Sequence, residues 1–227
     1  RFVQWKISMR KEIKIPIHKY NYLIFKSWID LNVKCQYEHE DRIVNSIYYD
    51  TNDFKSAQDN LAGISDRKKY RIRWYNDDKK NLLYEVKIKK NNLGKKISLK
   101  TDSNFEDFEN FFSFTNNCYK NSNGKFFLEN INHFDLKPKI KISYLRSYYI
   151  FKKKVRITFD RELNYIFLNK FNLYNEKILD NMCVIELKFH EKNNDLAQEL
   201  IQSSNFVPKR FSKYLRSLYF AGKSIYI

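Results

Sequence analysis

The 227-residue sequence contains only four glycines and three prolines, which argues against repeated tight hairpins and Pro-rich linkers. Its three cysteines, Cys35, Cys118 and Cys183, are scattered and odd in number, which fits a reducing compartment better than a disulfide scaffold. The four histidines form neither an HxH nor an HExxH spacing, so no zinc site is predicted. No apolar run approaches the ~18 residues of a membrane span.

Basic residues are what the sequence has in excess, with 43 lysines and arginines against 26 acids and a net charge of +17. Such an excess indicates an anionic partner: nucleic acid, phospholipid head groups or a phosphorylated small molecule. The alternative is compositional bias, because the lysines accompany heavy use of asparagine and isoleucine. Hydrophobic residues make up 43% of the chain, enough for a core, and no composition shift marks a boundary. We expect one domain over residues 1–227.

Apolar and polar residues alternate along eight segments, which is the period of a β-strand with one buried face. These predicted strands span residues 9–17, 42–50, 69–75, 82–89, 95–100, 139–149, 154–160 and 183–190. Apolar residues three and four apart predict helices over 18–31, 105–112, 196–203 and 209–220. Because many strands occur without strand–helix alternation, the expected fold is α+β, an antiparallel sheet or barrel with helices packed outside.

The predicted strands carry polar faces on which cations outnumber acids. In YRIRWY, Arg71 and Arg73 are two residues apart and therefore share one face. Other same-face sets are Arg10, Glu12 and Lys14; Glu85, Lys87 and Lys89; Lys96, Ser98 and Lys100; Arg156, Thr158 and Asp160; and Glu186, Lys188 and His190. For each strand alone, a solvated sheet face is the simpler explanation. Together these faces predict a positively charged barrel lumen. Repulsion between like charges there would raise the free energy of the empty protein by several kcal/mol at an effective dielectric constant of ~20.

A phosphate chain with a divalent metal would fill such a lumen. Arginine forks bind phosphate oxygens in pairs, lysines bind as point charges, and sparse carboxylates hold Mg²⁺ or Mn²⁺ against the phosphates. The last predicted helix adds a basic stripe of Lys209, Lys213 and Arg216. Taken alone, that stripe is better explained as the solvated face of a surface helix.

A series of motifs resembles the VTC-type polyphosphate polymerase domain of the triphosphate tunnel, or CYTH-like, superfamily. In chain order these motifs are RKEIK at 10–14, SIYYDT at 46–51, YRIRWY at 70–75, YEVKIKKNNLGKKISLK at 84–100, YLRSYY at 144–149, VRITFD at 155–160, VIELKF at 184–189 and VPKRFSKYLRSLYF at 207–220. The resemblance covers nearly the whole chain. It implies an antiparallel, eight-stranded β-tunnel that transfers the γ-phosphoryl group of ATP onto a growing polyphosphate chain with Mn²⁺ or Mg²⁺.

The resemblance also implies roles for individual residues. The catalytic phosphate ligands would be Lys14, Arg71, Arg73, Lys87, Lys96, Arg146, Arg156 and Lys213. Substrate-binding roles would fall to Lys89, Tyr144, Lys188 and Arg10, and metal binding to Glu186, with Glu12 and Glu85 as further candidates. The expected partners are ATP and inorganic polyphosphate, and nucleic acid is not expected.

The first predicted strand departs from the superfamily's hydrolases and cyclases, which open with E-x-E-x-K. Arg10, Glu12 and Lys14 stand at these positions, so a cation replaces one acid. This favours a polymerase over an inorganic triphosphatase or a cyclase. A non-catalytic polyphosphate or nucleotide binder is a further alternative. An RNA-binding protein is another, but it needs exposed aromatics, whereas here most alternate onto apolar faces.

Eukaryotic relatives carry an SPX-like region and membrane segments, and this sequence contains neither. It therefore resembles stand-alone microbial members or an excised domain. We expect a cytoplasmic location, or the cytosolic face of a membrane with tethering through another region or a partner.

Overall fold

The computed structural model describes residues 10–32, 35–90, 93–101, 135–168 and 177–222. Among these, nine strands form one antiparallel sheet with the order β1-β9-β7-β6-β2-β3-β4-β5, and β8 pairs with β7. The strands are β1 (Arg10–His18), β2 (Cys35–Asp50), β3 (Arg67–Tyr75), β4 (Leu82–Lys90), β5 (Leu93–Thr101), β6 (Lys137–Phe151), β7 (Val155–Phe167), β8 (Lys177–Leu179) and β9 (Met182–His190). The predicted antiparallel α+β architecture is confirmed.

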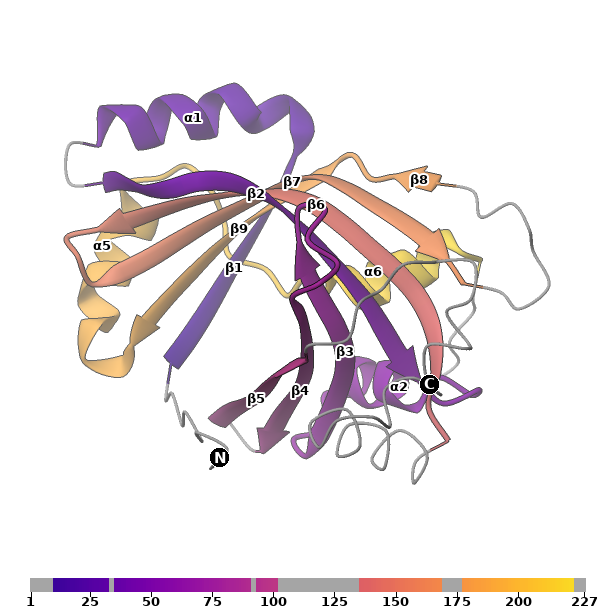
Figure 1. Ribbon diagram of the computed structural model, residues 1–227. Helices are drawn as coiled ribbons and strands as arrows, with labels where there is room; N and C mark the ends of the chain where they lie inside the picture. The colour runs from indigo at the N-terminus through magenta and orange to yellow at the C-terminus, as the bar shows by residue number, and fades with distance from the viewer. Residues whose placement is uncertain (1–9, 33–34, 91–92, 102–134, 169–176, 223–227) are drawn as a thin grey trace.

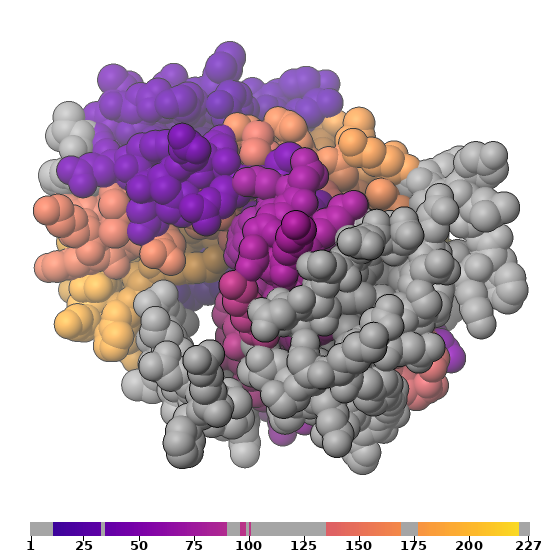
Figure 2. All heavy atoms as spheres, in the orientation of Figure 1, coloured from indigo at the N-terminus to yellow at the C-terminus, as the bar shows by residue number. Residues whose placement is uncertain are grey.

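The sheet curls until its two ends approach each other (Figure 1). Glu12 of β1 and Lys87 of β4 stand near opposite ends of the strand order, yet Lys87 Nζ lies 3.5 Å from Glu12 Oε2. Figure 2 shows a hollow between the magenta strands β4 and β5 and the orange and yellow elements on the other side. We call the inward side of the curled sheet the concave face.

Two helices cover the outer side of β1, β9 and β7, as predicted: α1 (Tyr22–Leu31) and α5 (Asn194–Gln202). In α1, Phe25 and Ile29 are four residues apart and therefore face the same way. Both are buried, and the ring of Phe25 stacks on Phe159 of β7 with centroids 4.2 Å apart. Because this outer side buries the apolar residues of the strands, their polar residues face inward.

The same alternation orients β3. Tyr70, Ile72 and Trp74 belong to a buried cluster with Tyr84 and Val86 of β4. The residues between them in β3 must point to the other side of the sheet, which is the concave face.

The C-terminal helix α6 (Lys213–Phe220) packs on the concave face. The ring of Tyr214 stacks on Tyr48 of β2 with centroids 5.3 Å apart, and its hydroxyl donates to Asp50 over 2.7 Å. Ser212 caps the helix by accepting a hydrogen bond from the N–H of Leu215. This packing places the first residue of α6 inside the curl of the sheet.

Several predicted boundaries differ from those of the structure. Strands β2, β6 and β7 are longer than expected, and the short helix α2 (Lys55–Leu61) was not predicted. The expected helix over 18–31 begins as a 3₁₀ turn over Lys19–Asn21. The helix expected over 105–112 lies outside the described residues. Within the described chain, no helix is both long enough and apolar enough to cross a membrane.

Candidate active site

The concave face gathers ionisable side chains from eight strands and α6. Its described members are Glu12, Lys14, Tyr48, Lys69, Arg71, Arg73, Glu85, Lys87, Lys96, Tyr144, Arg146, Asp160, Glu186, Lys188 and Lys213. Cations outnumber carboxylates in this set. The alternation of β1, β3, β4, β5 and β9 had predicted most of them, and the curl of the sheet brings them together.

Arg71 and Arg73 lie side by side on β3 and differ in their partners. Arg71 Nε donates to Glu85 Oε2 over 2.7 Å, and its Nη1 donates to the hydroxyl of Tyr48 over 3.0 Å. Arg73 is buried and binds neutral oxygens: its Nε donates to Ser46 Oγ over 3.1 Å, and its Nη2 donates to the Tyr144 hydroxyl over 3.3 Å. The guanidinium of Arg73 also lies near Glu85, with Nη1 3.8 Å from Oε2, the oxygen that Arg71 Nη2 approaches to 2.6 Å. The two arginines therefore share one carboxylate, and Arg71 is the closer of the two.

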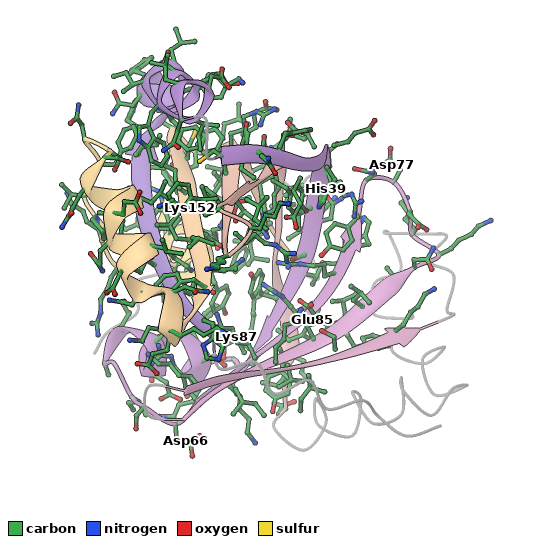
Figure 3. All side chains as sticks on the ribbon, turned by 90° about the vertical axis from the view of Figure 1, so that its left-hand side faces the viewer. His39, Asp66, Asp77, Glu85, Lys87 and Lys152 are labelled. Atoms are coloured by element: carbon green, nitrogen blue, oxygen red, sulfur yellow. The ribbon has the colours of Figure 1, made fainter. Side chains whose placement is uncertain are left out.

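Glu85 is 1% exposed and both of its carboxylate oxygens are engaged. Lys96 Nζ lies 2.6 Å from Oε1, to which Ser98 Oγ also donates over 3.1 Å. Burial raises the pKa of Glu85, but Arg71, Arg73 and Lys96 outweigh it and hold the pKa well below its usual range. Figure 3 places Glu85 on β4, on the inner side of the curled sheet. The geometry favours a role in positioning cations over the metal binding that the resemblance implied for this residue.

A second buried ion cluster lies where β6, β7, β9 and α6 meet. Arg146 forks onto Asp160, with Nε 2.5 Å from Oδ1 and Nη2 2.7 Å from Oδ2. Lys213 Nζ lies 2.6 Å from Asp160 Oδ2 and 3.1 Å from Glu186 Oε1. Burial opposes ionisation of Asp160, but Arg146 and Lys213 lower its pKa. Lys213 keeps its charge because Asp160 and Glu186 overcome burial and raise its pKa.

Glu12 and Glu186 flank Lys14 on neighbouring strands. The Nζ of Lys14 lies 3.3 Å from Glu12 and 3.8 Å from Glu186, and Lys188 Nζ lies 2.8 Å from Glu186. Burial and Glu186 raise the pKa of Glu12, but Lys14, Lys87 and Lys188 lower it to about 2. Burial likewise raises the pKa of Glu186, and the same kind of lysine pairing holds it well below its usual range. Both carboxylates are therefore ionised near neutral pH.

This carboxylate pair fits a divalent cation of the Mg²⁺ or Mn²⁺ type. Mg²⁺ is usually held by one or two carboxylates together with waters and phosphate oxygens, so a cage of protein ligands is not required. Among the described residues, no three His, Cys, Asp or Glu side chains are grouped closely enough to hold a metal. A metal held by Glu12 and Glu186 would therefore need further ligands from water or from phosphate oxygens.

Three of the residues named from the sequence, Arg156, Lys89 and Arg10, lie away from this centre or cannot be placed, and a fourth, Lys87, belongs to the concave face but is exposed. Arg156 is at the rim, where its Nη2 binds Glu38 over 3.0 Å and half of its side chain is exposed. Lys89 pairs in register with Gly94 and Arg67 near an end of β4. The backbone of Arg10 pairs with His190 in β1, but its side chain lies outside the described residues. Lys87 is exposed and reaches across to β1 (Figure 3).

Sequence reasoning missed two ionisable residues of this site. Asp160 was recognised on the same face as Arg156 but was given no role, because nothing local shows that it meets Arg146. Lys69 precedes Arg71 by two residues, so the alternation that selected Arg71 and Arg73 also selects Lys69. Tyr48 and Ser46, which position the arginines, carried no comparable signal.

A cavity of about 500 Å³ lies elsewhere, between α1 and parts of β2, β6 and β7. It is lined by Tyr22, Tyr37, Asp41, Tyr149, Arg161 and neighbouring residues. Arg161 already binds Asp41 over 2.7 Å and Ser147 over 2.6 Å. None of the ionisable residues of the concave face lines this cavity, so it is separate from the candidate site.

Comparison with known proteins agrees with this fold. The family model for the VTC domain matches residues 9–221. A structure from Vibrio parahaemolyticus, described as a candidate adenylate cyclase, has a TM-score of 0.55 and 15% identity, with 93% of this chain and 99% of that chain covered. A Hippeastrum protein, described as a candidate adenylyl cyclase with a dominant triphosphatase activity, has a TM-score of 0.54 and 12% identity, with coverages of 94% and 97%.

A third structure, from Bacillus halodurans and also described as a candidate adenylate cyclase, has a TM-score of 0.53 and 13% identity, covering 90% of this chain and 97% of that chain. No curated protein sequence matches the chain. At these identities, the similarity to the solved structures establishes a common fold and no more.

Proposed function

The chain belongs to the VTC domain family, as its motifs predicted, and from this premise we propose that it is a polyphosphate polymerase. It transfers the γ-phosphoryl group of ATP onto a growing chain of inorganic polyphosphate. The observation that carries the proposal is the excess of inward-facing cations, with Arg73 bound to the neutral oxygens of Ser46 and Tyr144. Glu85 is the carboxylate nearest to Arg73, at 3.8 Å, and it is shared with Arg71 and Lys96. One carboxylate among three cations leaves positive charge available for phosphate oxygens.

The arginines of β3 suit a chain of phosphoryl groups. Residues two apart in a strand are separated by about 7 Å, so Arg71 and Arg73 can contact different groups of one extended chain. Guanidinium groups stay charged at any working pH and therefore act electrostatically, by stabilising charge as the bond to the leaving ADP breaks. Glu85 and Tyr48 hold Arg71 in place before substrate arrives, which lowers the cost of organising the site.

Lys213 of α6 and Arg146 of β6 supply further positive charge on the concave face. Lys213 remains an ammonium because Asp160 and Glu186 raise its pKa, so it serves as a charge rather than a base. Lys14 and Lys188 add charge beside the two glutamates. A Mn²⁺ or Mg²⁺ ion held by Glu186 and Glu12 would neutralise phosphate charge and orient the transferred group.

The first strand supports a polymerase over a hydrolase. Arg10 occupies the position of the first glutamate in the E-x-E-x-K opening of the superfamily's hydrolases and cyclases. Fewer carboxylates favour binding of a long polyanion over activation of water.

The test is to incubate the protein with ATP and Mn²⁺, separate the products on a gel stained for polyphosphate, and measure ADP and inorganic phosphate. We expect a ladder of polyphosphate, with ADP formed in step and little free phosphate. Phosphate release from tripolyphosphate, without a ladder from ATP, would instead indicate an inorganic triphosphatase. Tripolyphosphate binding without turnover would indicate a non-catalytic binder, and retardation of RNA across a salt series would indicate an RNA-binding protein.

A further inference from the structure

A series of side-chain contacts connects a buried aspartate, Asp50, with Arg71 of the concave face. The carboxylate of Asp50 accepts hydrogen bonds from the N–H groups of Ser56 over 2.9 Å and Ala57 over 3.2 Å, in the first turn of α2. The hydroxyl of Tyr214 donates to the same carboxylate over 2.7 Å. Because Asp50 is fully buried, it fixes the end of β2, α2 and α6 to one another.

The ring of Tyr214 makes the next contact. It stacks on the ring of Tyr48, with centroids 5.3 Å apart and an angle of 13° between the planes. Both tyrosines are buried, so neither ring can turn without displacing its neighbours. Stacked aromatic pairs also attract each other beyond the area that they bury. The stack therefore holds the ring of Tyr48 in one orientation.

Tyr48 in turn holds Arg71, its direct partner in the register of β2 and β3. The Tyr48 hydroxyl accepts a hydrogen bond from Arg71 Nη1 over 3.0 Å, and the guanidinium carbon lies 5.8 Å from the ring centroid. Glu85 takes the other edge of the guanidinium, through Nε and Nη2. Two attachments on different edges fix the plane of the guanidinium, and the attachment to Tyr48 cancels none of its charge.

We propose that Tyr214, anchored by Asp50, is a positioning residue for Arg71 and acts through Tyr48. The stack fixes the Tyr48 hydroxyl, and this hydroxyl keeps the remaining N–H groups of Arg71 in one orientation for a phosphate chain. Donors that are ordered in advance bind an anion more tightly, because less order has to be created on binding. This inference rests on the proposed function for the choice of a phosphate chain as the ligand.

Lys213, the residue before Tyr214, is held independently of these contacts. Its Nζ lies 2.6 Å from Asp160 and 3.1 Å from Glu186, which belong to β7 and β9. A change at Tyr214 that leaves the fold intact should therefore affect phosphate binding through Arg71, because the ion pairs of Lys213 remain.

The experiment is a double-mutant cycle, measured by calorimetric titration with tripolyphosphate at neutral pH without ATP or metal. Tyr214→Leu removes the stack and the hydrogen bond to Asp50, whereas Tyr48→Phe keeps the ring and removes only the hydroxyl that Arg71 binds. In the parent background, Tyr214→Leu should lower the affinity about tenfold. In the Tyr48→Phe background, it should lower the affinity no more than about twofold, because the connection to Arg71 is already broken.

Urea denaturation of the same proteins separates this role from a purely structural one. Tyr214→Leu should lower the free energy of unfolding by similar amounts in both backgrounds, since Tyr48→Phe keeps a ring for the stack. The effects should thus be coupled in affinity and additive in stability. Tyr219→Leu is the matched control, because Tyr219 lies on the same helix and is 77% exposed. It should bind tripolyphosphate as the parent does.

Tyr214→Phe repeats the cycle with a smaller change, and it decides the question if Tyr214→Leu fails to fold in thermal melts. It keeps the ring but loses the hydrogen bond to Asp50. It should lower the affinity about threefold in the parent background and leave it unchanged in the Tyr48→Phe background. An equal loss in both backgrounds, or undiminished binding by the folded Tyr214 variants, would overturn the proposal.

The proposed polymerase activity is judged separately by the product ladder, because the cycle measures binding alone. Coupled losses of affinity without a ladder would keep the positioning role and reject the polymerase. A ladder together with equal losses in both backgrounds would do the reverse.

Discussion

Arg71 and Glu85 face each other across β3 and β4, and Arg71 Nε donates a hydrogen bond to Glu85 Oε2 over 2.7 Å. The register places them directly opposite, and Lys96 of β5 reaches the other carboxylate oxygen. A buried acid on a cationic face is thereby explained: it orients cations from the strands on both sides.

Replacing Arg71 or Arg73 with lysine should lower turnover with ATP by at least about tenfold, or about 1.4 kcal/mol of transition-state stabilisation. Lysine keeps the positive charge but loses the planar fork that binds two phosphate oxygens. Initial rates of ADP formation give the measurement. Lys68→Arg is the control, because Lys68 is exposed on β3 and alternates to the face opposite Arg71 and Arg73, and it should keep the parent rate. If both variants form ADP at the parent rate, Arg71 and Arg73 have only a structural role.

Glu85→Gln should lower the free energy of unfolding by about 1–3 kcal/mol, because Arg71 and Lys96 lose their charged partner. Lys96 is partly exposed and can turn to water, which limits the loss. If Glu85 only positions cations, the affinity for Mn²⁺ should stay the same. Urea denaturation and Mn²⁺ binding followed by electron paramagnetic resonance give the two values. A marked loss of Mn²⁺ affinity would make Glu85 a metal ligand after all.

Glu186→Gln should abolish metal-dependent turnover and weaken Mn²⁺ binding, while the fold remains intact by circular dichroism. The amide keeps the shape of the side chain but removes the negative charge that a divalent cation requires. The same substitution at Glu12 should weaken Mn²⁺ binding less, because Glu12 is the more exposed of the two. Full activity of Glu186→Gln with Mn²⁺ would remove this residue from the metal site.

Stability should fall in acid because Glu85, Asp160 and Glu186 all have lowered pKa values in the folded protein. A lowered folded-state pKa stabilises the protein above the unfolded value, roughly pH 4, and this contribution disappears as pH falls further. Denaturant unfolding at pH 6 and pH 3 measures the difference. Asp160→Asn should be less stable than the parent at pH 6 and should lose less on acidification. An equal loss in both proteins would show that Asp160 does not contribute.

Alternation along each strand was enough to predict which side chains share a face. Arg71 with Arg73, and Glu85 with Lys87, were identified in this way, because a period of two residues is a local property of the extended backbone. The antiparallel α+β fold followed from the number of such strands and the absence of strand–helix alternation. The family could be recognised because its motifs are short, local and in order.

Tertiary structure decided which of those faces meet. Asp160 joins Arg146 and Lys213 only because β6 and β7 are neighbours and α6 packs on the concave face through Tyr214. The basic stripe of the last helix, taken alone, predicted that Lys213 is a surface cation. Glu12 and Lys87 meet across the curl although they are 75 residues apart in the chain. Lys69 meets the hydroxyl of Ser212, 143 residues away, only because α6 packs on the concave face. Such relationships depend on strand order and sheet curvature, which arise from long-range packing that no local period records.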